Sequence, residues 1–254
     1  MLVLCYGMQK SGSTLAFEMV RGVLQSAGFD QPFIYNDLRD PTEASRNYVG
    51  KIGKDVICKL IDTIGADRKI AVKTHATLSN DLFSWAEEQQ RRREIQIVTS
   101  YRDPRDVCLS LLDAGAKSRS KNAGAFGNIE SLDDAADFVR GRIARFRKWS
   151  SVQGTLRLNY DTVAYEPEKA IAAIEHALGV HSDKDAVLKH AFEDAYTLKN
   201  AARRHRYLTE MNDVQKEELT RKFRRFLTQA CENDNQAWYN KCRLNVLEGR
   251  NSDA

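Results

Sequence analysis

The chain has 254 residues, of which 42% are hydrophobic and 29% charged, and its formal net charge at pH 7 is +4. This length can bury a sizeable core in one large α/β domain without disulfides or metals. The composition excludes a collagenous, disordered or membrane-embedded chain. The net positive charge is small, and the basic residues occur in local arginine-rich clusters. The simplest interpretation of such clusters is that they lie on solvent-exposed faces of helices.

The five cysteines are scattered, with no CxxC pair and no histidine at zinc-ligand spacing. This pattern favours a reducing compartment. The apolar run at the N-terminus is too short for a signal-peptide core and lacks a basic leader, and no later stretch reaches membrane-spanning length. We therefore expect a cytoplasmic protein without a membrane span.

The first part of the chain contains two predicted strand-turn-helix units. The apolar run at residues 2–6 predicts a strand, residues 7–14 form a glycine-containing turn, and apolar residues recur at helical spacing over 15–24. Residues 69–73 predict a second strand, and Ser79 is placed to cap the helix that follows. Each unit leads from a buried strand into a helix.

Two further units of the same kind follow. Residues 95–99 predict a strand, and the Asp-Pro pair after it opens a helix over 107–112. Residues 155–160 predict a fourth strand, followed by a helix over 162–178 that Gly179 closes. Such units imply right-handed crossovers, so we expect an α/β sandwich of three layers with a mainly parallel central sheet.

The whole chain, residues 1–254, is predicted to form a single domain with an α/β core over 1–180. Residues 181–254 are highly charged and predict a helical C-terminal extension. Residues 114–130 are rich in small side chains and predict a long mobile loop.

The predicted strand ends carry the residues with candidate chemistry. Ligands of parallel α/β sheets bind at the carboxyl ends of the strands. Those ends here are followed by residues 7–14, Lys73-Thr74-His75, Arg102-Asp103 and Tyr160-Asp161. We therefore expect one site at this edge of the sheet.

Residues 7–14 have the glycine spacing G-x-x-x-x-G of a phosphate-binding loop and end in hydroxyl residues at the start of a helix. Backbone N–H groups in such a turn form an anion site. Nucleoside-triphosphate enzymes have a lysine directly after the second glycine, but here Ser13 stands there and Lys10 precedes Gly12. The strand ending at Lys73 also offers no acidic magnesium ligand. An ordinary strand-to-helix turn remains the alternative for this loop alone.

Two motifs carry a family resemblance. Residues 10–14, Lys-Ser-Gly-Ser-Thr, are similar to a Lys-Ser-Gly-Thr-Thr core, and residues 102–110 fit the pattern Arg-Asn/Asp-Pro-x-Asp-x-x-x-Ser. These are the 5'-phosphosulfate and 3'-phosphate motifs of sulfotransferases that use 3'-phosphoadenosine 5'-phosphosulfate (PAPS), which the chain therefore resembles. Lys73-Thr74-His75 resembles a segment of the cytosolic branch, and residues 158–161 resemble the stretch whose tyrosine contacts adenine. The resemblance covers roughly residues 1–180.

The resemblance implies a P-loop-type fold, PAPS as the sulfuryl donor and adenosine 3',5'-bisphosphate (PAP) as the product. Lys10 would neutralise the leaving phosphate oxygen, His75 would be the general base and Lys73 would steady the sulfuryl oxygens. Leu15 departs from the family, because it stands where cytosolic members have a tryptophan stacked on adenine. The expected cofactor-binding residues are Gln9, Lys10, Ser11, Gly12, Ser13, Thr14, Leu15, Arg102, Ser110, Tyr160, Arg203 and Arg204.

The C-terminal part departs further from the family pattern. Its Arg-Lys-Gly-x-x-Gly cofactor loop is absent, and residues 203–207, Arg-Arg-His-Arg-Tyr, occupy the comparable place. A merely solvated helix end is the alternative for this segment. Likewise, a carboxylate could replace His75 as the base, although the other histidines are expected away from this edge.

The resemblance implies an acceptor that offers a hydroxyl or amine and is a small molecule, carbohydrate or lipid, and no nucleic acid or metal is expected to take part. Residues 114–130 and 35–48 are expected to line its pocket. Two other functions remain open: a P-loop kinase-like phosphotransferase, and a non-enzymatic protein that binds anions or nucleic acid through its arginine clusters. Neither accounts for Lys73-Thr74-His75 together with residues 102–110.

Overall fold

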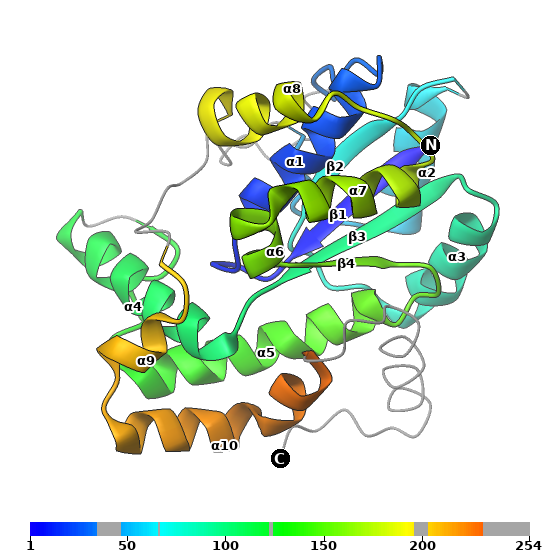
Figure 1. Ribbon diagram of the computed structural model, residues 1–254. Helices are drawn as coiled ribbons and strands as arrows, with labels where there is room; N and C mark the ends of the chain where they lie inside the picture. Colours follow the sequence, from blue (N-terminus) through cyan, green and yellow to red (C-terminus); the bar gives the residue numbers. More distant parts are fainter. Residues whose placement is uncertain (35–46, 66, 122–123, 196–202, 231–254) are drawn as a thin grey trace.

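The computed structural model describes residues 1–34, 47–65, 67–121, 124–195 and 203–230 (Figure 1). Its centre is a sheet of four parallel strands in the order β2-β1-β3-β4. The strands are β1 (Leu2–Gly7), β2 (Ile70–Thr74), β3 (Ile95–Tyr101) and β4 (Leu156–Asn159). The predicted α/β fold with a parallel central sheet is therefore confirmed.

Helices cover both faces of this sheet. One layer contains α1 (Ser13–Ser26), α6 (Tyr160–Tyr165), α7 (Pro167–Leu178) and α8 (Lys184–Lys189). The opposite layer contains α2 (Lys54–Ile64), α3 (Asn80–Arg91), α4 (Pro104–Ser120), α5 (Leu132–Ser150) and α10 (Asp213–Ala230). A π-helical turn (His190–Asp194) extends α8, and the short α9 (Arg206–Glu210) precedes α10.

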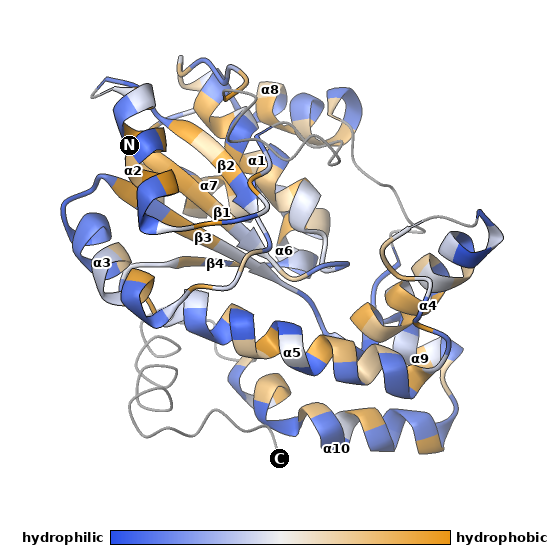
Figure 2. Ribbon diagram, turned by 180° about the vertical axis from the view of Figure 1, so that it is seen from behind, coloured by the Kyte–Doolittle hydropathy of each residue, from blue (hydrophilic) through white to orange (hydrophobic). Residues whose placement is uncertain are grey.

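The alternation of side chains along β1 divides the core between the two layers. Leu2, Leu4 and Tyr6 pack with α2, α3 and α5, whereas Val3 and Cys5 pack with α1 and α7. Every residue of β1 is buried, as is typical of a parallel strand covered on both faces. Figure 2 shows mainly hydrophobic residues along β1 and β2 at the centre of the molecule, and a mixture of hydrophilic and hydrophobic residues along α5 and α10.

The helix boundaries that local chemistry predicts are confirmed. The Ser79 side chain accepts a hydrogen bond from the backbone N–H of Leu82, and Pro104 opens α4 after its cap Asp103. Gly179 ends α7 with φ 60°, in the left-handed region that glycine adopts without a Cβ clash. These interactions involve neighbours in the sequence, so the local pattern was sufficient to find them.

The loop predicted from residue 114 is wrong for residues 114–120, because α4 continues to Ser120. At Gly115, helix α4 contacts the segment that leads into α5: a Cβ on Gly115 would lie 2.3 Å from the Ile129 carbonyl oxygen. Arg119 donates to the Gly127 and Ile129 carbonyls at 3.1 and 2.7 Å. The small residues therefore allow close packing in this part of the segment.

The helix predicted over residues 162–178 is two helices. The first, α6, already begins at Tyr160, and the chain turns at Glu166 before α7 starts with Pro167. Proline lacks an N–H and fits the first helical position, so it starts a new helix there. None of the helices in the described part of the chain is both long and apolar enough to cross a membrane.

Candidate active site at the carboxyl end of the sheet

The strand register brings the predicted site segments together. Gly7 on β1 pairs with Ser100 on β3, and Tyr6 pairs with Thr74 on β2. Tyr101 on β3 pairs with Asn159 at the end of β4. The segments that follow the four strands therefore begin side by side at one edge of the sheet, as predicted.

The loop between β1 and α1 is closed by its own backbone. Lys10 and Gly12 both have left-handed conformations, with φ 67° and 79°. Ser11 donates its hydroxyl to the Met8 carbonyl at 2.7 Å, and its N–H to the same oxygen at 3.2 Å. No side chain caps the start of α1. The helix therefore presents its first N–H groups at the loop, as an anion site requires.

Tyr160 fills the space between the loop and the end of β3. A Cβ added at Gly12 would lie 2.3 Å from Cδ2 of Tyr160, so only glycine allows this approach. The Arg102 guanidinium carbon lies 4.3 Å from the centre of the same ring, and Tyr165 meets the ring edge-on. Tyr160 is thus held by three neighbours, and its predicted contact with adenine stays a prediction.

Lys73 and His75 lie on the other side of the loop. The buried Lys73 ammonium donates to the Thr14 hydroxyl at 2.9 Å. The His75 Nδ1 lies 2.6 Å from the carbonyl oxygen of Gly7, the first residue of the loop. Because a carbonyl only accepts, Nδ1 carries the proton and Nε2 is the basic nitrogen. The structure therefore orients an imidazole base against the loop.

The surroundings of His75 keep its ring neutral. Burial, together with the positive charge of Lys73, lowers the pKa of His75 to about 3, and the hydrogen bond to Gly7 opposes this shift. The Tyr48 ring lies 5.6 Å from the His75 ring, and the Val49 N–H bonds to the Lys73 carbonyl at 2.9 Å. Of the segment predicted to line the acceptor pocket, Tyr48 lies beside His75, and residues 35–46 lie outside the described part.

The charges that act on the Lys10 side chain belong to Arg102, just after β3, and to Asp113 and Lys117 on α4. Burial lowers the pKa of Lys10; the nearby Asp113 raises it, while Lys117 and Arg102 lower it further. Lys10 forms no hydrogen bond or ion pair with any residue that the structure describes. Its ammonium is therefore available to an anionic ligand at the loop.

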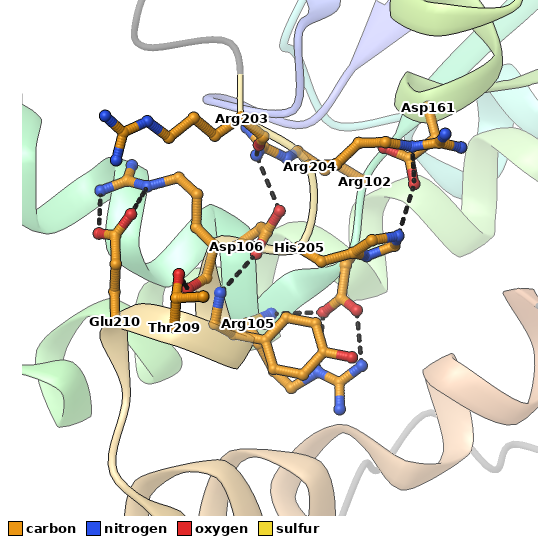
Figure 3. Close-up of polar contacts among 12 residues, drawn as sticks. Arg102, Arg105, Asp106, Asp161, Arg203, Arg204, His205, Thr209 and Glu210 are labelled. Carbon is orange, nitrogen blue, oxygen red and sulfur yellow. Dashed lines mark hydrogen bonds and ion pairs between the residues drawn. The ribbon is translucent and has the colours of Figure 1, made fainter.

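Arg102 is buried at the end of β3 and is held by two acceptors. One terminal nitrogen donates to Asp106 at 2.8 Å and to the Arg203 carbonyl at 3.0 Å (Figure 3). Its Nε is buried without a partner in the described structure. Ser110, also buried, lies two turns further along α4. The structure thus brings the predicted Arg102 and Arg203 into contact.

The segment before α9 crosses this edge of the sheet and exposes three basic side chains, Arg203, Arg204 and His205. Arg204 and His205 each lie 3.8 Å from the Asp161 carboxylate (Figure 3). The expectation that His205 lies away from the strand ends is therefore wrong. Sequence order alone placed it far from β4, and only the return of the C-terminal helices brings it back.

Arg206 anchors the same segment. It bonds to Glu210 through two nitrogens at 2.8 and 2.7 Å, and to Asp113 on α4 at 2.7 Å. The Tyr207 N–H donates to Asp106 at 3.1 Å. Sequence reasoning did not find these carboxylates: Arg206 and Glu210 have the four-residue spacing of a helical ion pair, whereas Asp113 and Asp106 are distant in the sequence.

Gln9 and Leu15, the remaining predicted cofactor residues, flank the core of the loop. The Gln9 Oε1 is buried and has no hydrogen-bond partner in the described structure, which is unusual for a buried polar atom. Leu15 packs against the apolar layer beneath α1. The Gln9 amide is thus the more available of the two for a polar ligand.

The arrangement as a whole suits an anionic ligand. It combines loop N–H groups, the cations Lys10, Lys73 and Arg102, and the neutral imidazole of His75. The described residues contain no group of three or more His, Cys, Asp or Glu placed to hold a metal ion. The residues that are present therefore favour binding through cations and backbone donors.

Comparison with known proteins supports the fold. No family model matches the chain, and no curated protein matches it. Among solved structures, the mouse sulfotransferase SULT7A1 complexed with PAP aligns with 94% of this chain and 88% of its own, with a TM-score of 0.55 and 13% identity. The sulfotransferase domain from the curacin biosynthetic pathway aligns with 86% of this chain and 95% of its own, with a TM-score of 0.49 and 11% identity. The chain has the sulfotransferase P-loop fold.

Proposed function

We propose that this chain is a sulfotransferase that moves the sulfuryl group of PAPS to a hydroxyl or amine of an acceptor. The carrying observation is the hydrogen bond between His75 Nδ1 and the Gly7 carbonyl, which supports a role for this imidazole as the base beside the loop that would bind phosphate. The fold supports the same reaction class, since the mouse sulfotransferase SULT7A1 shares it.

The donor would bind along the strand ends from β1 to β4. The N–H groups at the start of α1, with Ser13 and Thr14, would hold its 5'-phosphate. Arg102 and Ser110 would hold its 3'-phosphate. The orphaned Arg102 Nε fits such a ligand, because it is a buried donor that needs an acceptor.

Other predicted residues complete the donor site. Arg203 and Arg204 would approach the 3'-phosphate from the C-terminal segment, since the Arg203 carbonyl already bonds to Arg102. Tyr160 and Leu15 border the adenine side. The charge-assisted bonds that arginine forms with phosphate are short and strong, so this side would contribute much of the affinity.

The transfer is an in-line displacement. Nε2 of His75 takes the proton of the acceptor hydroxyl as its oxygen forms a bond to sulfur, and the bond from sulfur to the phosphate oxygen breaks. Lys10 stabilises the negative charge that appears on that phosphate oxygen. Lys73, held by Thr14, stabilises the sulfuryl oxygens during the transfer. PAP is then the leaving product.

Calorimetric titration tests the donor assignment. PAP is expected to bind much more tightly than AMP, because AMP lacks the 3'-phosphate that Arg102 would contact. Equal affinities for PAP and AMP would contradict the proposal. Tighter binding of ATP than of PAP would instead favour a kinase-like phosphotransferase.

A pair of histidine variants tests the base. His75→Ala should lower turnover by about 100-fold or more while PAP affinity stays nearly unchanged, since general bases contribute at least that much. His181→Ala, at an exposed position after α7, is the matched control and should retain full activity. A His75→Ala enzyme that loses PAP binding would indicate a structural role.

A further inference from the structure

Helix α5, which carries Arg142 and Arg145, packs against Tyr6 and against Ala76, the residue after His75. The helix is anchored there by Trp149, whose indole stacks on Tyr6 with ring centres 5.6 Å apart and donates to the Ala76 carbonyl at 3.0 Å. Arg142 precedes Trp149 by two helical turns and so lies on the same face of α5. Its charge acts on His75, Tyr6 and Tyr48.

These arginines lack carboxylate partners. Neither Arg142 nor Arg145 forms a hydrogen bond or ion pair with any residue in the described part of the chain. The Arg142 guanidinium lies over the Phe138 ring at 4.2 Å, and its Nε is buried without a partner. The Tyr6 hydroxyl is likewise buried and unpaired. Buried polar atoms in folded proteins are nearly always bonded, and the described part of the chain supplies no acceptor for Arg142 Nε or the Tyr6 hydroxyl, so an anionic ligand fits here.

The charges point to the chemistry of that ligand. Burial and the adjacent Arg145 lower the pKa of Arg142, because the two like charges repel each other. An anion between them would relieve this repulsion and accept bonds from both guanidinium groups. The sites already described for the donor use Lys10, Lys73 and Arg102, so this pair has no role there.

We propose that Arg142, Arg145 and the Tyr6 hydroxyl bind an anionic group of the acceptor, while the acceptor's hydroxyl faces His75. The proposal rests on the sulfotransferase function and names its substrate class: hydroxylated molecules that carry a carboxylate, phosphate ester or sulfate ester. Neutral phenols and neutral lipids would then be poor acceptors. Arginine suits this role because its planar donors match the oxygens of these anions.

Calorimetry on the PAP-saturated protein tests the proposal, because PAP then fills the phosphate loop. The probes are 4-hydroxybenzoate and its neutral analogue 4-hydroxybenzamide, followed by 4-hydroxyphenyl phosphate and 4-hydroxyphenyl sulfate to rank the anions. The carboxylate should bind about 10- to 100-fold more tightly than the amide, as expected for hydrogen bonds to a charged group. Arg142→Gln should remove most of that preference.

Arg140→Gln is the matched control, because Arg140 lies on the same helix with its side chain 48% exposed and paired with Asp137. This variant should keep the full preference. Equal binding of carboxylate and amide by the wild type, or a preference that survives Arg142→Gln, would overturn the proposal. Thermal melting of both variants separates a lost site from a lost fold.

Turnover distinguishes an acceptor site from a donor site. If Arg142→Gln lowers kcat/KM equally for neutral and anionic acceptors, the arginines act on the sulfuryl group and the proposal fails. If the wild type shows no preference for PAP over AMP, the sulfotransferase function fails first. The difference between benzoate and benzamide, measured without PAP in the wild type and in Arg142→Gln, then still shows whether the anion site exists.

Discussion

The two arginine-rich regions around the candidate site differ in their partners. After β3 and on α9, Arg102 bonds to Asp106, and Arg206 bonds to Asp113 and Glu210. Near His75, by contrast, Arg142 and Arg145 on α5 have no carboxylate partner among the described residues. Buried charges are stable only when they are paired or bind a ligand. Paired arginines therefore hold the architecture in place, whereas unpaired ones preserve a positive potential for an anion.

Among the variants that test this comparison, the one that removes the carboxylate partner of Arg102 should lose the most stability. Asp106→Ala leaves a buried guanidinium without its carboxylate and also removes the acceptor for the Tyr207 N–H. We expect a loss of about 3–5 kcal/mol in the free energy of unfolding, measured by urea denaturation.

The matched control is Asp137→Ala on α5, where the ion pair with Arg140 is exposed. Its loss should stay below about 1 kcal/mol, because solvent screens exposed pairs. If the two variants lose equal stability, the distinction between buried and exposed partners does not hold here.

An effect of intermediate size is expected in the pH dependence of the free energy of unfolding, to which His75 contributes. Burial and Lys73 lower the pKa of His75 from 6.5 to about 3, so below pH 6.5 the unfolded chain binds a proton that the folded chain does not. The free energy of unfolding should therefore fall by about 1–2 kcal/mol between pH 6.5 and pH 5 from this group alone. Urea midpoints at the two pH values measure this fall.

His75→Gln should flatten that dependence, since glutamine does not titrate. In Arg142→Gln, the pKa of His75 should rise toward its ordinary value, because Arg142 contributes to lowering it. An unchanged slope in His75→Gln would show that other groups control acid stability.

The smallest expected effect concerns Asp113, which forms an ion pair with Arg206 and whose charge also acts on Lys10. Its carboxylate raises the pKa of Lys10, against the lowering by burial. In Asp113→Asn this support is lost, so Lys10 loses its proton at a lower pH, and PAP affinity should weaken a few-fold at alkaline pH. Calorimetric titrations at pH 7 and pH 9 compare the variant with the wild type; a uniform loss at both pH values would contradict the assignment.

Several features of the site followed from the sequence because they depend on neighbours along the chain. The loop at residues 7–14, the caps at Ser79 and Asp103, and the order of strands and helices are local patterns. Because parallel strands share one carboxyl edge, this order also predicted that Lys73, His75 and Arg102 approach the loop. The roles of these residues stay predictions.

Other features were decided by contacts between distant segments. Gly115 packs against the Ile129 carbonyl in the part of α4 that the composition had predicted to be a loop. His205 lies beside Asp161, although the two are distant in the sequence.

The sequence by itself therefore determined the α/β order, the glycine-containing loop at residues 7–14 and the residues at the strand ends, because backbone sterics and hydrogen bonds act over a few residues. Only the tertiary structure decided which charges are compensated. It pairs Arg206 with the distant Asp113 but leaves Arg142 without a described carboxylate partner, because ion pairing depends on distance in space and on burial.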